Sequence, residues 1–209
     1  VIVKADQSIS PGMAGLLAAA GVSRVAVFKR PKVAIVATGD EIVLPGAPLP
    51  KGKLYASNMV TLASFCGQFG MSLQMETAKD HFETLLGKLE TAHAQADALL
   101  TSGGAWTGDR DLVVKVLEKM GWQQHFHRIR IGPGKAVGFG MLKGKPVFIL
   151  PGGPPSNLMG FLQIALPGLR RLAGEPEPTL REESFPLASD IKGRDRDWTQ
   201  FVFGRVDHD

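Results

Sequence analysis

Hydrophobic positions follow two spacings along residues 31–173. The run KVAIVATG is rich in β-branched residues and ends in glycine, which is typical of a strand buried on both faces. Residues 57–70 and 80–96 carry apolar side chains at helical spacing, with Ser57 and Asp80 at the expected helix starts. The same patterns predict further strands in SLQMETAK, DALLTSGG, HFHRIRI, AVGFGML and KPVFILPGG, and further helices in DLVVKVLEKM and SNLMGFLQIALPGLRRLAG.

This alternation predicts an α/β fold, because strands that alternate with helices form βαβ units. We expect a mainly parallel sheet with helices on both faces, in a domain of residues 31–173. The segments HFHRIRI and AVGFGML can pair with each other as extended strands.

The two flanks have a different character. Residues 1–30 contain a Ser-Pro helix start at Ser10, a glycine stop at Gly21 and then a short predicted strand, so we interpret them as the remnant of a preceding domain. Residues 174–209 open with the proline-rich EPEPTL and end in a short β segment, for which we expect a hairpin around residues 193–197.

Composition narrows the class of protein. Hydrophobic residues make up 44% and charged residues 21% of the 209, as in ordinary globular chains. No apolar run approaches the roughly 20 residues that span a bilayer, and the first residues lack a signal-peptide pattern. The single cysteine, Cys66, excludes an internal disulfide and is expected to be an inert core residue. We therefore expect a cytoplasmic protein with no membrane partner.

Charge is unevenly distributed around a net value of +4. Residues 120–174 hold seven Lys and Arg and no acid, whereas the tail from Glu175 holds nine acidic and five basic residues. A local positive field favours an anionic ligand, although charge alone favours the simpler interpretation of a solvated basic face. Few aromatic residues interleave with the basic ones, so we expect no nucleic-acid partner.

Three glycine-rich loops follow predicted strands: Thr38–Glu41, Thr101–Asp111 and Pro151–Asn157. Ligands of open α/β sheets bind at the carboxyl ends of the strands, and glycine lets a ligand approach the backbone. Free amides at a helix start would also favour an anion after the last strand. Any one of these loops could be a simple tight turn. None is a P-loop, and no G-x-G-x-x-G follows the first strand, which disfavours nucleotide hydrolases and dinucleotide enzymes.

Carboxylates gather in the same loops and suggest a Mg²⁺ site, because Mg²⁺ prefers oxygen ligands. The alternative is that acids such as Asp80 and Asp109 only favour helix N-termini electrostatically. His125 and His127 would share one face of a strand without a third metal ligand. Trp106 could stack on a planar heterocycle or pack its own loop, and the sequence leaves both interpretations open.

Five segments, taken in order, resemble a known motif series. VAIVATGDEIV, LYASN, ALLTSGGAWTGDRD, RIRIGPGKAVGFG and VFILPGGPPSNLMGF are similar to the motifs of molybdopterin molybdenumtransferases, the MoeA/gephyrin family. The likeness covers residues 9–174. It implies the α/β fold shared with MogA and MoaB proteins, and the tail resembles the start of the family's C-terminal β-barrel domain.

The resemblance implies a transferase that binds adenylylated molybdopterin, hydrolyses its phosphoanhydride and inserts molybdate to give molybdenum cofactor and AMP. By motif position, Glu41, Asp80 and Asp111 would be the catalytic acids and the Mg²⁺ ligands. Lys135 would attract the anionic ligand. The other residues expected to bind ligand are Thr38, Gly39, Asp40, Thr101, Ser102, Gly103, Gly104, Asp109, Pro151, Gly152, Pro154 and Ser156.

Four positions depart from the family pattern. Ala56 replaces an acid, Gly132 a lysine, Trp106 a serine and Gly153 an asparagine. These substitutions motivate an alternative function as a non-catalytic molybdopterin-binding module. A third alternative, a molybdopterin adenylyltransferase, is disfavoured by the β tail. The resemblance also implies a homodimer or larger homo-oligomer, with other cofactor-assembly proteins as further partners.

Overall fold

A six-stranded sheet forms the centre of the computed structural model, which describes residues 3–104, 112–193 and 197–206. Its strand order is β4-β1-β5-β9-β8-β6. β4, β1, β5 and β9 run parallel, β8 is antiparallel to β9, and β6 is antiparallel to β8. The predicted mainly parallel sheet and the pairing of its last strands are confirmed. The bounds are β1 (Lys32–Thr38), β4 (Ser72–Ala78), β5 (Ala98–Ser102), β6 (Gln123–His127), β8 (Gly138–Leu142) and β9 (Lys145–Leu150).

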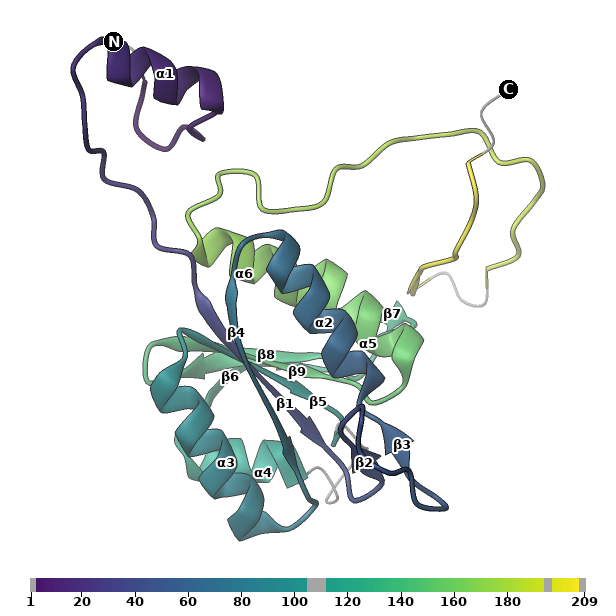
Figure 1. Cartoon of the computed structure of the whole chain (residues 1–209). Helices are drawn as coiled ribbons and strands as arrows, with labels where there is room; N and C mark the ends of the chain where they lie inside the picture. Colours follow the sequence, from purple (N-terminus) through teal and green to yellow (C-terminus); the bar gives the residue numbers. More distant parts are fainter. Residues whose placement is uncertain (1–2, 105–111, 194–196, 207–209) are drawn as a thin grey trace.

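Helices cover both faces of the sheet (Figure 1). One face carries α2 (Ser57–Gln68), α5 (Pro154–Gly160), the π-helical turn η2 (Phe161–Ala165) and α6 (Leu166–Leu172). The other carries α3 (Phe82–Gln95) and α4 (Leu112–Lys119). Two apolar clusters fill the layers, and neighbouring strand residues alternate between them: Ile35 and Leu100 join the first, Val36 and Leu99 the second. β1 and β5 are therefore buried on both faces, as their apolar sequences predict.

The last predicted helix contains a π-helical turn before Pro167. Proline lacks the N–H that would bond to the preceding turn. The backbone N–H of Leu166 instead donates to Phe161 O, five residues back. The widened turn lets the helix continue through the proline into α6.

The residues that cap two helices differ from those expected from the sequence. Ser57 is the first residue of α2, whose cap position is Ala56, and α3 begins at Phe82 after His81 rather than at Asp80. Neither cap side chain accepts a hydrogen bond from a backbone N–H of its helix, although His81 Nδ1 lies 3.4 Å from Thr84 Oγ1 in α3. Packing of Leu62, Leu85 and similar residues on the sheet therefore stabilises these helices more than capping does.

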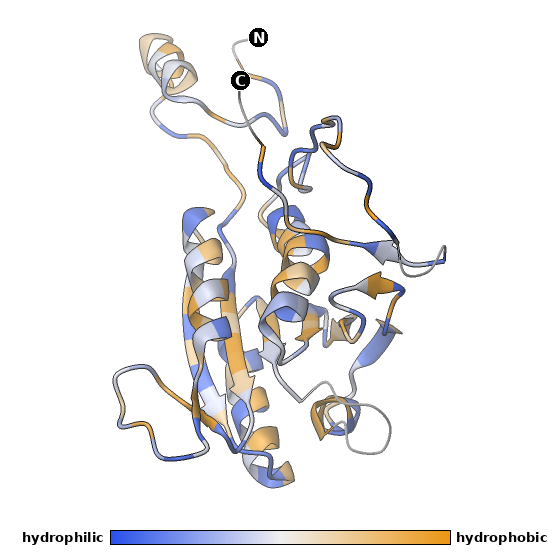
Figure 2. Cartoon of the chain, turned by 90° about the vertical axis from the view of Figure 1, so that its right-hand side faces the viewer, coloured by the Kyte–Doolittle hydropathy of each residue, from blue (hydrophilic) through white to orange (hydrophobic). Residues whose placement is uncertain are grey.

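The N-terminal flank forms α1 (Pro11–Ala19), which stands apart from the sheet (Figure 1). Ser10 caps the helix as predicted, accepting a hydrogen bond from Met13 N at 3.3 Å. None of its residues is buried, although Figure 2 colours it largely as hydrophobic. The strand expected after Gly21 is wrong, because residues 22–31 form no strand in the structure.

The C-terminal flank also departs from expectation. Instead of a hairpin around residues 193–197, of which 194–196 lie outside the described residues, β10 (Thr199–Gln200) pairs in parallel with β7 (Ile131–Gly132). A second short pair, β2 (Ile42–Val43) with β3 (Leu54–Tyr55), was not predicted. No described helix is long and apolar enough to cross a membrane.

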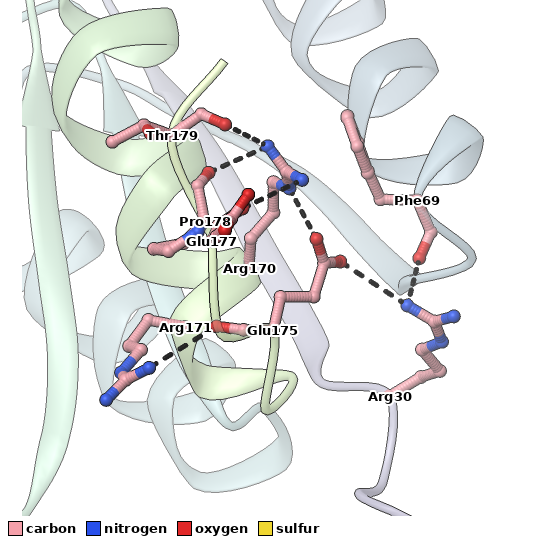
Figure 3. A network of polar contacts seen from close by, with 8 residues as sticks. All are labelled: Arg30, Phe69, Arg170, Arg171, Glu175, Glu177, Pro178 and Thr179. Carbon is pink, nitrogen blue, oxygen red and sulfur yellow. Dashed lines mark hydrogen bonds and ion pairs between the residues drawn. The ribbon is translucent and has the colours of Figure 1, made fainter. Parts of the chain in front are cut away.

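Arg170 joins the end of the domain to the segment that follows it (Figure 3). Its Nε donates to Glu175 Oε2 at 2.7 Å, and Nη1 donates to the carbonyls of Pro178 and Thr179, each at 2.8 Å. The guanidinium also lies over the ring of Phe69, 4.9 Å from its centroid. One planar group with several donors thus holds α2, α6 and the linker together.

We expect Arg170→Ala to lower the free energy of unfolding by about 1–3 kcal/mol, because it leaves partly buried acceptors without a donor. Arg171→Ala is the matched control, since Arg171 makes one exposed contact of 3.5 Å to Glu175 O, and it should cost less than about 0.5 kcal/mol. Urea denaturation measures both variants. Equal losses in the two would contradict this role of Arg170.

Candidate functional site

A cavity of about 640 Å³ lies at the carboxyl ends of β1, β5 and β9, between the starts of α2 and α5. Parallel register brings three loops together there, since Ala37 pairs with Ser102 and Ser102 pairs with Leu150. This is the edge at which open α/β sheets bind ligands. The lining residues are Ala37, Thr38, Glu41, Ile42, Leu54, Tyr55, Ala56, Ser57, Asn58, Met59, Ser102, Gly103, Gly104, Pro151, Gly152, Gly153 and Pro154.

Two glycines let the β5 loop lie against the end of β1. A Cβ on Gly103 would lie 2.4 Å from Thr38 O, and one on Gly104 would lie 2.4 Å from Val113 Cγ2. Both residues also have positive φ angles, 101° and 70°. Any side chain at either position would therefore force this wall of the cavity to move.

Two asparagines that the sequence reasoning did not single out hold the turn after β9. Asn157, 2% exposed, donates through Nδ2 to Pro151 O at 2.8 Å and to Ser102 Oγ at 3.0 Å. Asn58 donates through Nδ2 to Gly152 O at 2.8 Å. They stand in the quoted segments LYASN and PGGPPSN, but no spacing rule shows that two asparagines on different helices meet the same turn.

The charge of the cavity differs from the sequence expectation. Glu41 is its acidic lining residue, and no Lys or Arg of the described chain lines it. The expectation of free backbone amides at the start of α5 is also wrong in part. Pro154 and Pro155 carry no N–H, and the N–H of Asn157 donates to Gly153 O. The described residues therefore offer an anion neutral donors rather than a cation.

Acidic groups meet beside the cavity. Asp80 N donates to Asp40 Oδ1 at 3.2 Å. Partial burial raises the pKa of the Asp80 carboxyl, and the negative charges of Asp40 and Glu41 raise it further, while a backbone hydrogen bond from Asp40 partly offsets these effects. The carboxylate of Glu41 folds over Gly39, whose Cβ would lie 2.7 Å from Oε2. Lys53 Nζ donates to the backbone carbonyl of Asp40 at 2.8 Å, but no ion pair is formed between a described Lys or Arg and the carboxylates of Asp40, Glu41 and Asp80.

The structure brings about half of the predicted site residues to one cavity. Gly39, Asp40, Asp80, Thr101 and Ser156 lie on the same loops, strand ends or helix start without lining it. Thr101 is fully buried, and its Oγ1 bonds to no described partner, as is also true of Thr38 Oγ1. The predicted residues that line the cavity are Thr38, Glu41, Ser102, Gly103, Gly104, Pro151, Gly152 and Pro154.

Lys135 does not line the cavity. It is exposed in the loop after β7, with Nζ 5.2 Å from the ring centroid of Trp198 in the tail. Of the four substituted positions, Ala56 and Gly153 line the cavity and Gly132 lies in β7.

The predicted metal ligands come together only in part. Glu41 and Asp80 interact electrostatically, as the pKa of Asp80 shows. Asp111, the third, lies outside the described residues, as do Asp109 and Trp106. Within the described residues, no three His, Cys, Asp or Glu side chains form a metal-binding group.

Fold and cavity together define an α/β domain with a cavity at the carboxyl edge of its sheet. Residues 34–171 match a family model described as a probable molybdopterin binding domain. The chain belongs to this family, and the resemblance in its motifs is confirmed.

Similar proteins agree with this assignment. A molybdopterin molybdenumtransferase of Haemophilus influenzae is 32% identical over 182 residues, covering 85% of this chain and 44% of that protein. The molybdenum cofactor synthesis protein cinnamon of Drosophila melanogaster is 37% identical over 157 residues, covering 74% and 26%. The chain thus spans half or less of the length of these curated relatives.

A crystal structure of a molybdopterin biosynthesis moea protein from Pyrococcus horikosii superposes with a TM-score of 0.73 at 37% identity, covering 83% of this chain and 43% of that one. A molybdenum cofactor biosynthesis protein B, 16% identical with a TM-score of 0.53, shares the fold.

We expect Asp40→Asn to lower the pKa of Asp80 toward the ordinary 3.8, because it removes the larger of the two neighbouring charges that raise it. Carboxyl ¹³C NMR titration measures this pKa, and Glu90→Gln, remote on α3, should leave it unchanged.

The same shift has a sign for stability. Because the pKa of Asp80 is raised in the folded state, this carboxyl stabilises the fold at pH values below 3.8. That contribution is lost as the pH rises through the raised pKa. Since Asp80 is largely exposed, Asp80→Asn should raise the free energy of unfolding at pH 7 by less than about 0.5 kcal/mol. A loss of stability would show that the carboxylate has a partner that this account omits.

Proposed function

We propose that the cavity binds molybdopterin or its adenylate and that the chain is the ligand-binding part of a molybdopterin molybdenumtransferase. One observation carries this proposal: the three glycine-rich strand ends converge on a single cavity within the region that matches the molybdopterin-binding family. The relatives named molybdopterin molybdenumtransferase support the transferase function. In this proposal the protein takes the adenylate and molybdate as substrates and releases molybdenum cofactor and AMP.

Each wall of the cavity has a distinct task in this reaction. Gly103 and Gly104 keep the loop after β5 packed against Thr38 and Val113, which holds this wall in place, and Ser102 donates a hydrogen bond to the ligand. Leu54 and Ile42 supply apolar surface for the planar pterin. Such positioning lowers the entropic cost of bringing molybdate and the ligand together.

Glu41 and Asp80, with Asp111, would hold Mg²⁺. The pKa of Asp80 is raised first by partial burial and then by the charges of Asp40 and Glu41, and a divalent cation beside these carboxylates would neutralise that charge. When bound, the ion would offset the charge of the phosphoanhydride as it is cleaved. Glu41, which lines the cavity, would orient the molybdate or water that approaches it.

A non-catalytic molybdopterin-binding module is the second candidate. Two substituted positions, Ala56 and Gly153, line the cavity, and no described Lys or Arg does. A cavity of this kind could retain binding while losing turnover. In either case we propose a cytoplasmic protein that assembles as a homodimer or larger homo-oligomer and works with other cofactor-assembly proteins.

A fluorescence titration with molybdopterin, with and without Mg²⁺, tests the binding proposal. We expect saturable binding at micromolar concentration or below, and Gly103→Val should abolish it because the new side chain would collide with the end of β1. Gly144→Ala is the control for the backbone strain of replacing a glycine with positive φ. It lies in an open turn with no atom within 4 Å of the added Cβ, so it should leave binding unchanged.

Release of AMP from adenylylated molybdopterin, dependent on molybdate, then separates the two candidates. Release shows a transferase, whereas binding without release favours the module. Absence of binding by a folded protein would contradict both.

A further inference from the structure

The orientation of the Asn157 amide is fixed by its partners. A carbonyl oxygen only accepts hydrogen bonds, so the atom facing Pro151 O at 2.8 Å must be the NH₂ nitrogen. The second hydrogen of this NH₂ group points to Ser102 Oγ at 3.0 Å. Asn157 is 2% exposed and Ser102 5%, so water does not compete freely for either bond.

This arrangement determines what the Ser102 hydroxyl can do. Because its oxygen accepts from Asn157, its own hydrogen must point elsewhere, and no described residue accepts it. Ser102 lines the cavity. The hydroxyl therefore presents a donor to whatever occupies the cavity.

The turn after β9 also presents hydrogen-bond donors to the cavity. The Nδ2 group of Asn157 donates to Pro151 O, and that of Asn58 donates to Gly152 O, each at 2.8 Å. The backbone N–H groups of Gly152 and Gly153, in contrast, donate to no described residue. Two asparagines from different helices thus each donate to a carbonyl of this wall, while the N–H groups keep their donors free, which suits an oxygen-rich anion in a cavity whose described lining holds no cation.

We propose that Asn157 is a positioning residue that holds the Ser102 hydroxyl as a donor to a phosphoryl oxygen of the ligand. The proposal rests on the cavity being the molybdopterin site proposed above, and it adds which atom of the protein recognises the phosphate and what orients that atom.

A double-mutant cycle tests it, with molybdopterin and inorganic pyrophosphate as separate probes. Ser102→Ala should weaken binding about 10-fold, as expected for the loss of one hydrogen bond to a charged group. Asn157→Ala should weaken it by a similar factor, because the released hydroxyl is free to turn away. The double variant should bind at most about 2-fold less tightly than the single variant with the lower affinity. Both substitutions remove the same hydrogen bond to the ligand, so their effects should not add.

A merely structural role of Asn157 predicts a different result, in which the two effects multiply to about 100-fold. Asn58→Ala is the matched control: it frees the neighbouring carbonyl without touching Ser102, so its effect should multiply with that of Ser102→Ala. Asn157→Leu, close to asparagine in size, repeats the cycle if Asn157→Ala does not fold.

The two probes separate the proposals. Molybdopterin binding with independent effects of Ser102 and Asn157 overturns the positioning role alone. Pyrophosphate binding with coupled effects, but no molybdopterin binding, overturns the proposed function and retains the phosphoryl donor. Binding of neither probe to the folded wild-type protein overturns both.

Discussion

The contact between Gly103 and the end of β1 is the constraint on which the cavity depends. Parallel pairing of Ala37 with Ser102 brings the two loops to one level, and the missing side chain at Gly103 lets the backbone pass the carbonyl of Thr38. Since a Cβ there would lie 2.4 Å from that carbonyl oxygen, no other residue keeps both the register and the approach. Ser102 then takes its place between Asn157 and the cavity.

A second consequence is the polarity of the site. Its described lining combines one acid, Glu41, with neutral donors, while the acids beside it raise the pKa of Asp80. An anionic ligand in such a place gains hydrogen bonds from one wall and needs a cation near the other. Mg²⁺ meets that need in the function we propose. The chain spans half or less of the length of the curated relatives described above.

Much of the fold could be predicted from the sequence because β1 and β5 are continuous apolar runs and α3 has clear helical spacing. Short elements could not be predicted. β7 and β10 have two residues each, and their pairing joins segments more than 60 residues apart that no local pattern links. Ser57 begins α2 as expected but does not cap it, and α3 begins two residues after Asp80, because capping preferences are weaker than packing on the sheet.

The same distinction holds for the site. Gly103 and Gly104 could be predicted as site residues because they directly follow a strand, and the position and conformational freedom of a glycine are local properties. Asn58 and Asn157 were missed because they act across the fold, each through an amide that reaches a backbone carbonyl. Lys135 was placed by motif resemblance, yet it lies over Trp198 and outside the cavity lining, so its role in attracting the ligand stays a prediction.

The most direct test of the central claim is a crystal structure of the folded chain with molybdopterin bound. We predict ligand density between α2 and α5, with a phosphoryl oxygen within hydrogen-bond distance of Ser102 Oγ and the ligand against Gly103 and Gly104. Density at another place, such as the separate cavity lined by residues 4–9, 26–28 and 173–177, would contradict the assignment of the ligand to the carboxyl edge of the sheet.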